Sequence, residues 1–276
     1  MNAPLGTITP RLQRTQGSGR IGVCLDGSGR TRLADLRQQG ALRLRLPRVP
    51  AGRAPEAVLI NTAGGLTGGD RLELDCALGP GSELWLTTQA CEKIYRSLDE
   101  YALQRVALDV GSDAQAVWLP QPAILFQDSA YRRVLEIDLA SGASLFAVEA
   151  SVLGRAAMGE RVTRCRLAER WRIRREGRLI WASEFALDDP AALTAVAALD
   201  GARAFATFVL AGYHAETALP RLREMVGSWH GKAGVSAPGE VLLGVLLAPD
   251  ADALMEDLRR LVEGFFERPM PRVWTC

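Results

Sequence analysis

The sequence predicts a mainly β protein in which sheets are layered or stacked, as in a solenoid or a sandwich, with two α-helices near the C-terminus. Two observations support this fold class. Polar and apolar residues alternate with a period of two through the middle of the 276-residue chain, as strands with one buried face require. The helical period of 3.6 residues is found only towards the C-terminal end.

Residues 1–20 are polar and rich in Gly, Thr and Pro, and they are expected to form a flexible lead-in to a single β-rich domain over residues 21–276. The start lacks the charged and apolar regions of a signal peptide, and no stretch approaches the ~20 apolar residues that span a bilayer. The five cysteines are widely spaced and include no C-x-x-C pair. We therefore expect a cytoplasmic protein with reduced thiols.

The alternation is clearest in residues 71–78, which are followed by turn residues at 79–82 and by an extended segment over 83–88. The same strand–turn–strand unit recurs twice at a spacing of roughly 30 residues, a period typical of stacked repeats. A fourth pair of strands is expected around a turn at residues 176–177. These further strands are predicted over residues 106–110 and 116–119, 135–139 and 145–148, and 163–173 and 178–186.

Two helices are predicted after the strands. One runs from Ala218 to about Trp229, and the other begins near residue 250, where the side chain of Asp250 or Asp252 can cap the helix N-terminus. Residues 231–239 are expected to form the connecting loop. Apolar residues at helical spacing predict the buried face of the second helix: Leu254, Leu258, Leu261, Val262, Phe265 and Phe266.

The glycine-rich segment over residues 61–70 is the first candidate binding site. A P-loop would continue with lysine and then serine or threonine, whereas Asp70 and Arg71 follow here, and the acidic side chain would repel phosphate. A dinucleotide-binding fingerprint would lead into a helix, whereas strand-like alternation follows. The segment therefore predicts a tight loop that uses glycine conformations. The alternative hypothesis is an enzyme that binds a small anion through the backbone N–H groups of this loop.

The sequence contains no self-sufficient catalytic or tight metal site. The two histidines, His214 and His230, lack the spacing of zinc ligands, and no G-x-S-x-G motif marks a nucleophilic serine. Cys91 could make a transient contact with a soft metal, or it could fill space at the end of a strand. A net charge of +1 and an aromatic content of 6% argue against nucleic-acid binding. The arginine-rich run over residues 170–175 is typical of a strand with one basic face.

Several unusual segments resemble the UreD family of urease accessory proteins, called UreH in some species. The matches occur in order from about residue 40 to residue 274, which is most of the chain. Cys91 departs from the family pattern, in which small residues such as alanine are more common. The matching segments are N-T-A-G-G-L-T-G-G-D-R-L (61–72), L-T-T-Q-A-C-E-K-I-Y-R-S (86–97), W-L-P-Q-P (118–122), L-G-R-A-A-M-G-E (153–160) and P-R-V-W (271–274).

The resemblance implies a non-enzymatic, β-rich scaffold with two helices that helps to load nickel into urease. The implied partners are the urease apoprotein subunits and the helical accessory protein UreF, which recruits the nickel-carrying GTPase UreG. No nucleic-acid or membrane partner is implied. No cofactor would be tightly bound, and nickel would be in transit through an internal, water-filled passage.

A passage of this kind requires scattered oxygen ligands rather than a closed coordination shell, because it must release its ion. The resemblance suggests three candidates for transient nickel contacts, namely Asp70 and Glu92 within the matched segments and Glu149 just before the segment 153–160. The resemblance also suggests polar residues that line the passage: Thr87, Thr88 and Gln89. A scaffold should expose apolar surface to its partners, and the aromatic candidates for that surface are Tyr95, Phe126, Tyr131 and Trp274.

Overall fold

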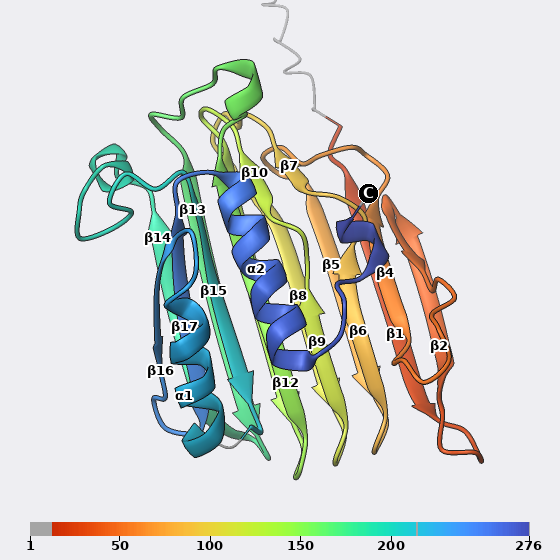
Figure 1. Ribbon diagram of the computed structural model, residues 1–276. Coiled ribbons are helices and arrows are strands. Elements are labelled where there is room, and N and C mark those ends of the chain that lie inside the picture. Colours follow the sequence, from red (N-terminus) through yellow and green to blue (C-terminus); the bar gives the residue numbers. More distant parts are fainter. Residues whose placement is uncertain (1–12, 214, 276) are drawn as a thin grey trace, which may run out of the picture.

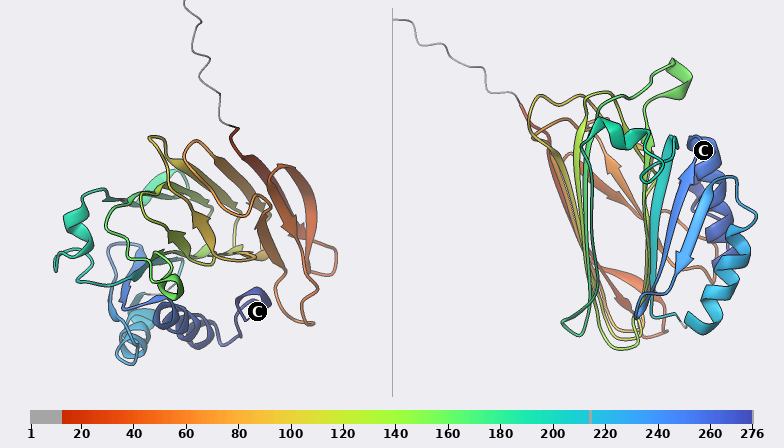
Figure 2. Two further views of the ribbon diagram at one scale, coloured as in Figure 1. Left: turned by 90° about the horizontal axis from the view of Figure 1, so that it is seen from above. Right: turned by 90° about the vertical axis from the view of Figure 1, so that its left-hand side faces the viewer.

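The computed structural model describes residues 13–213 and 215–275. In this part of the chain, two β-sheets pack face to face, and helices α1 (Ala215–Val226) and α2 (Ala251–Phe266) cover the outer face of one sheet (Figure 1 and Figure 2). The mainly β, layered fold predicted from the sequence is confirmed. None of the helices in the described residues is long and apolar enough to cross a membrane.

The first sheet has seven strands and the second has ten. Spatial order in the seven-stranded sheet is β14 (Arg178–Leu187), β13 (Arg166–Arg175), β11 (Ala130–Leu139), β8 (Ala102–Val110), β5 (Arg71–Leu78), β1 (Gln16–Leu25) and β2 (Thr31–Gly40). The ten-stranded sheet runs β16 (Lys232–Ser236), β17 (Val241–Ala248), β15 (Ala204–Ala211), β12 (Ser144–Leu153), β9 (Gln115–Leu119), β6 (Glu83–Thr88), β4 (Glu56–Asn61) and β3 (Leu42–Arg45), with β10 (Ala123–Leu125) beside β12 and β7 (Glu92–Ile94) beside β10.

The three predicted strand–turn–strand units are arches that join the two sheets. In each unit the first strand lies in the seven-stranded sheet and the second lies in the ten-stranded sheet, and successive units pair in parallel. The turns stack as well, because the N–H of Gly81 donates to the carbonyl of Ser112 (2.8 Å) and the N–H of Asp113 donates to that of Ser141 (3.0 Å). Each turn has one left-handed residue, namely Gly81, Asp113 or Gly142. This part of the molecule is therefore solenoid-like.

The fourth predicted pair is a true hairpin within one sheet. Strands β13 and β14 pair antiparallel around Glu176 and Gly177, which both have positive φ (49° and 77°). Two successive left-handed residues form the type I′ turn whose twist suits a two-residue hairpin.

The first strand, β1, begins at Gln16 and pairs in parallel with β5. Residues 16–20 of the expected flexible lead-in are thus part of a sheet, and residues 1–12 lie outside the described part of the chain.

Both predicted helices are present. The carboxylate of Asp250 caps α2 by accepting from the N–H of Ala253 (2.9 Å), and the predicted first helix begins three residues earlier and ends at Val226. The prediction of a connecting loop over residues 231–239 was wrong, since this segment contains the edge strand β16. That strand has a weak sequence signal, because its two inward positions are Ala233 and Val235 and only the second carries a large apolar side chain.

The two layers of packing form two separate apolar cores. One core lies between the sheets and includes the inward residues of β5, β8, β11 and β13. The other lies between the outer face of the ten-stranded sheet and the helices, where Leu254, Leu258 and Leu261 of α2 are fully buried. Both faces of the ten-stranded sheet are consequently buried, whereas the seven-stranded sheet buries one face.

The second core predicts unequal effects for two glycines of the β16–β17 hairpin. A methyl group at Gly244 would overlap the ring of Phe208, whereas one at Gly234 would meet nothing. We expect Gly244→Ala to lower the free energy of unfolding by about 1–3 kcal/mol through overpacking. Gly234→Ala, the matched control, should be neutral or slightly stabilising. Chemical denaturation measures both, and equal stabilities for the two variants would contradict this packing.

Candidate functional site

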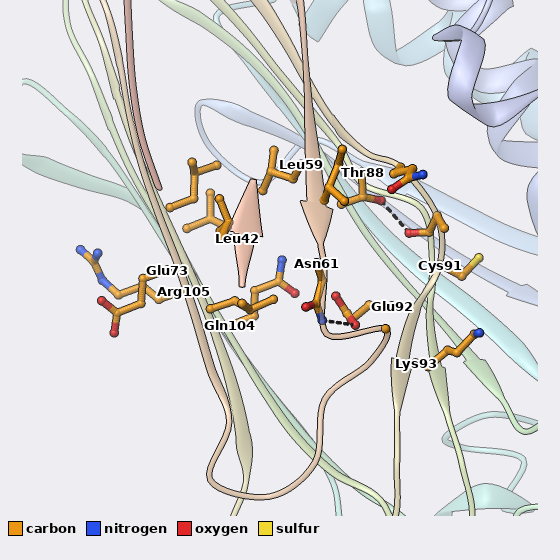
Figure 3. A pocket seen from close by; sticks show the side chains of 17 residues that line it. Leu42, Leu59, Asn61, Glu73, Thr88, Cys91, Glu92, Lys93, Gln104 and Arg105 are labelled. Atoms are coloured by element: carbon orange, nitrogen blue, oxygen red, sulfur yellow. Dashed lines mark hydrogen bonds between the residues drawn. The ribbon is translucent and has the colours of Figure 1, made fainter. Parts of the chain in front are cut away.

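A cavity of about 140 Å³ lies between the sheets, near the ends of β4 and β6 and the starts of β5 and β8 (Figure 3). It is large enough for several water molecules. In Figure 3, Asn61, Glu92 and Gln104 lie close together in the space between the strands, while Lys93 points away from it. The apolar part of the wall includes Leu42, Leu59, Leu72, Leu74 and Val106.

Glu92, the first residue of β7, has the most unusual environment in the cavity. Its Oε1 accepts a hydrogen bond from Nδ2 of Asn61 (2.9 Å). Burial raises the pKa of Glu92 to about 7, although the bond from Asn61 and the charge of Lys93 act in the opposite direction. Near neutral pH this carboxyl group can therefore gain or lose a proton readily.

The glycine-rich loop holds Asn61 in place. The N–H of Ala63 donates to Oδ1 of Asn61 (3.0 Å), and Nδ2 of Asn61 also reaches the carbonyl of Gly65 (3.3 Å). Gly64 and Gly65 have positive φ (77° and 152°), as expected for a tight loop. A side chain at Gly65 would also collide with Tyr95. The loop thus fixes the side-chain amide of Asn61, which in turn donates a hydrogen bond to Glu92.

The same loop is poorly suited to bind an anion. Within it, the backbone N–H groups of the following residues already donate to protein oxygen atoms: Ala63, Gly64, Leu66, Thr67, Gly69 and Asp70. Anion cradles need several convergent N–H groups without other partners. This geometry argues against the alternative hypothesis of an anion-binding enzyme.

A row of polar side chains leads from the cavity into the interior. Gln104 on β8, Arg133 on β11 and Glu169 on β13 are neighbours across three adjacent strands and face the other sheet. Gln104 lines the cavity and accepts a hydrogen bond from the hydroxyl of Tyr131. The guanidinium of Arg133 contacts the carboxylate of Glu169 and, at 2.9 Å, that of Glu149 on the opposing sheet.

The Glu149–Arg133–Glu169 cluster is almost completely buried. Burial raises the pKa of Glu149, as does the charge of Glu169, whereas Arg133 lowers it. Burial alone would lower the pKa of Arg133, but the two carboxylates outweigh it and raise that pKa. The cluster is also held by neutral groups, since Arg133 donates to the carbonyl of Ala150 (2.8 Å) and Nε1 of Trp118 donates to Glu149 (2.8 Å).

Of the residues nominated from the sequence, Glu92, Thr88 and Gln89 line the cavity. Glu149 lies deeper, in the buried cluster. Thr87 lies on the opposite face of β6, where its hydroxyl accepts from Nε1 of Trp274 (2.9 Å). Asp70 does not line the cavity. Its carboxylate links two segments of the chain by accepting hydrogen bonds from the N–H groups of Thr15 (2.7 Å) and Thr67 (2.8 Å).

The structure does not gather these residues into one metal site. Within the described residues, no group of three or more His, Cys, Asp or Glu side chains could hold a metal ion. Cys91 lies at the cavity, 3.8 Å from Oε1 of Gln121, and burial raises the pKa of its thiol. His230 contacts the buried Asp257 through its backbone N–H (2.9 Å) and its ring. His214 and Cys276 lie outside the described residues.

The aromatic residues proposed for an exposed surface have different environments. Tyr95 is 42% exposed, whereas Phe126 and Tyr131 are buried, which corrects that expectation for these two. Phe126 is covered by the Tyr95 ring and the Arg155 guanidinium. Tyr131 lies on the inward face of β11, together with the apolar residues of that strand. Trp274 is half-buried against the outer core.

Three of these polar residues were not predicted from the sequence, although a signal for them was present: Gln104, Arg133 and Glu169. Arg133 has the same parity in its strand as the inward residues Leu135 and Ile137. Glu169 likewise shares the parity of Leu167, Trp171 and Ile173, and Gln104 that of Ala102, Val106 and Leu108. A polar or charged residue that interrupts an apolar face at constant parity indicates a buried polar site.

The buried cluster predicts a large effect for a single substitution. Arg133→Met would leave two buried carboxylates without a cation, and we expect it to lower the free energy of unfolding by about 3–5 kcal/mol. The triple variant Arg133→Met, Glu149→Leu, Glu169→Leu should recover most of this loss, because no uncompensated charge remains. Chemical denaturation at neutral pH tests both expectations. Wild-type stability in the single variant would show that the cluster is not electrostatically coupled.

Glu92 predicts a specific pH dependence. Because its pKa is higher in the folded state than in the unfolded state, Glu92 stabilises the fold below its ordinary pKa and this contribution is lost as the pH rises through about 7. We expect Glu92→Gln to match the wild type near about pH 5 and to exceed it by roughly 1–3 kcal/mol near about pH 8. Parallel unfolding free energies across this range would contradict the environment described for Glu92.

Comparison with known proteins agrees with the resemblance seen in the sequence. Residues 16–275 match the family model described as UreD urease accessory protein. The chain is 43% identical over 271 residues to the urease accessory protein UreD of Mesorhizobium japonicum, covering 96% of both chains. It is 45% identical to that of Rhizobium rhizogenes, covering 98% of this chain and 99% of the relative. With urease accessory protein UreD 1 of Brucella melitensis the identity is 44%, over 96% of this chain and 95% of the relative. The chain belongs to the UreD family of urease accessory proteins.

Proposed function

We propose that this protein is a cytoplasmic accessory scaffold, and not an enzyme, that is required for the nickel-dependent maturation of urease. It would bridge the urease apoprotein and UreF, and through UreF the GTPase UreG. Nickel would cross it through an internal passage without a tightly bound cofactor. The membership of the chain in the UreD family supports the accessory role.

The polar row between the sheets is the observation that supports conduction. It connects a cavity that can hold water with Glu149 and Glu169 inside an otherwise apolar core. Carboxylate, amide and hydroxyl oxygen atoms lower the cost of removing water from a divalent ion. Because these groups are spread over successive strands, they can assist the ion without forming the closed shell that would trap it.

Glu92 and the buried cluster would have different roles along this route. A carboxyl group with a pKa near 7 can release its proton when a cation arrives and take it back when the cation leaves. In the cluster, two acidic side chains face one basic side chain, Arg133. The excess acidic side chain would attract the ion without enclosing it.

The proposal predicts that cavity variants separate conduction from assembly. We expect Glu92→Gln to lower nickel-dependent activation of urease on the order of tenfold, because the carboxylate that would meet the ion is lost. The variant should still co-purify with urease and UreF, since Glu92 lies inside the molecule. Asp109→Asn, which removes an exposed carboxylate from β8, is the matched control and should activate normally.

The assay is co-expression with the urease subunits, UreF and UreG, followed by pull-down on this chain and measurement of urease activity. Omission of the chain should abolish activation, and normal activation without it would contradict the accessory role. Full activation by Glu92→Gln, with assembly intact, would contradict only the proposed route through this cavity.

A further inference from the structure

The outer face of the seven-stranded sheet is not covered by either described helix (Figure 2). Strand β13 directs Leu167, Trp171 and Ile173 into the core, so the arginines between them point outward. Arg166, Arg170 and Arg172 therefore form a row on this open face. The row lies on the opposite side of the sheet from the cavity and the buried cluster.

At one end of the row, two guanidinium groups pack against a single aromatic ring. The Cζ atoms of Arg132 and Arg166 lie 4.7 Å and 5.0 Å from the ring centre of Tyr101. Arg166 is fixed further by donating to the carbonyl of Asp99 (2.9 Å). Stacking orders a guanidinium while its N–H groups remain able to form hydrogen bonds.

Positive charge predominates in this area. Among the described residues, neither Arg132 nor Arg166 forms an ion pair, while Glu184 lies 2.6 Å from Arg172 and 3.6 Å from Arg170. Arg170 and Arg172 thus share the carboxylate of Glu184, and Arg172 also lies beside Glu136 of β11, whereas Arg132 and Arg166 have no carboxylate partner in the described part of the chain. We define the basic cluster as Tyr101, Arg132, Arg166, Arg170 and Arg172.

We propose that the basic cluster is a docking site for an acidic segment of a partner protein. Stacked guanidinium groups without a carboxylate partner suit bidentate recognition of Asp or Glu side chains. The outward part of β13 from Arg166 to Arg172 spans roughly 20 Å at ~3.3 Å per residue, the length of a short peptide segment. The near-neutral whole chain provides no long-range field for nucleic acid, which favours a protein partner.

The test is fluorescence anisotropy of a labelled oligoglutamate peptide titrated with the full-length protein at low salt. We expect Arg132→Ala/Arg166→Ala to weaken binding by at least roughly tenfold. The matched control is Arg20→Ala/Arg37→Ala, which removes the same charge from exposed positions of β1 and β2 on the same face. Thermal unfolding verifies that both variants remain folded.

Further variants and probes distinguish the proposal from a general charge effect. Arg132→Lys/Arg166→Lys keeps the charge but loses the stacked planar groups, so it should bind the peptide nearly as poorly as the alanine variant. Equal binding by wild type, cluster variant and control variant would overturn the proposal. Tighter cluster-dependent binding to single-stranded DNA or to phosphatidylserine vesicles than to oligoglutamate would also overturn it, because the site would then serve phosphates.

Discussion

The parallel stacking of the β-arches is the constraint on which the rest of the structure depends. Each arch adds one strand to both sheets, and the register passes from one strand to the next without a shift through β5, β8 and β11. Residues of equal parity are therefore stacked in rows across the sheet. A slip of one residue in β11 would expose Arg133 and place Arg132 in the core. The left-handed residues at the arch turns and the inward leucines oppose such a slip.

This constraint explains how a charged group can lie inside an apolar sandwich. The next inward row is apolar and consists of Leu74, Val106, Leu135 and Trp171. Surrounded by such residues, Arg133 is tolerated because carboxylates approach it from both sheets. Stability alone does not account for the cluster, since replacing buried charges by apolar residues of similar volume often costs little stability. Its presence is better explained by a requirement for polar groups between the sheets.

Local chemistry made much of the fold predictable from the sequence. The turn at Glu176-Gly177, an aspartate cap at the start of α2 and the recurring strand–turn–strand units depend on neighbouring residues and were predicted, although Asp250 and Asp252 were both candidates for the cap. The sheet to which each strand belongs depends on distant pairing, as does the use of Asp70 to bind the N–H of Thr15. Thr87 and Thr88 were both expected to line the passage, but strand alternation puts them on opposite faces of β6, and Thr87 faces Trp274 of the C-terminal segment instead. For these reasons the candidate site was only partly predicted.

Strand β13 shows how one alternating sequence can serve two surfaces. Its inward residues place Glu169 beside Arg133, while its outward arginines, two positions apart, face the open side of the sheet. The backbone of the strand separates the two sets, so a partner held by the outer arginines would not need to enter the space between the sheets. On the proposed function, this separation would let the outer face bind a partner while the polar groups between the sheets serve the passage. Alternation with a period of two achieves it without any additional element.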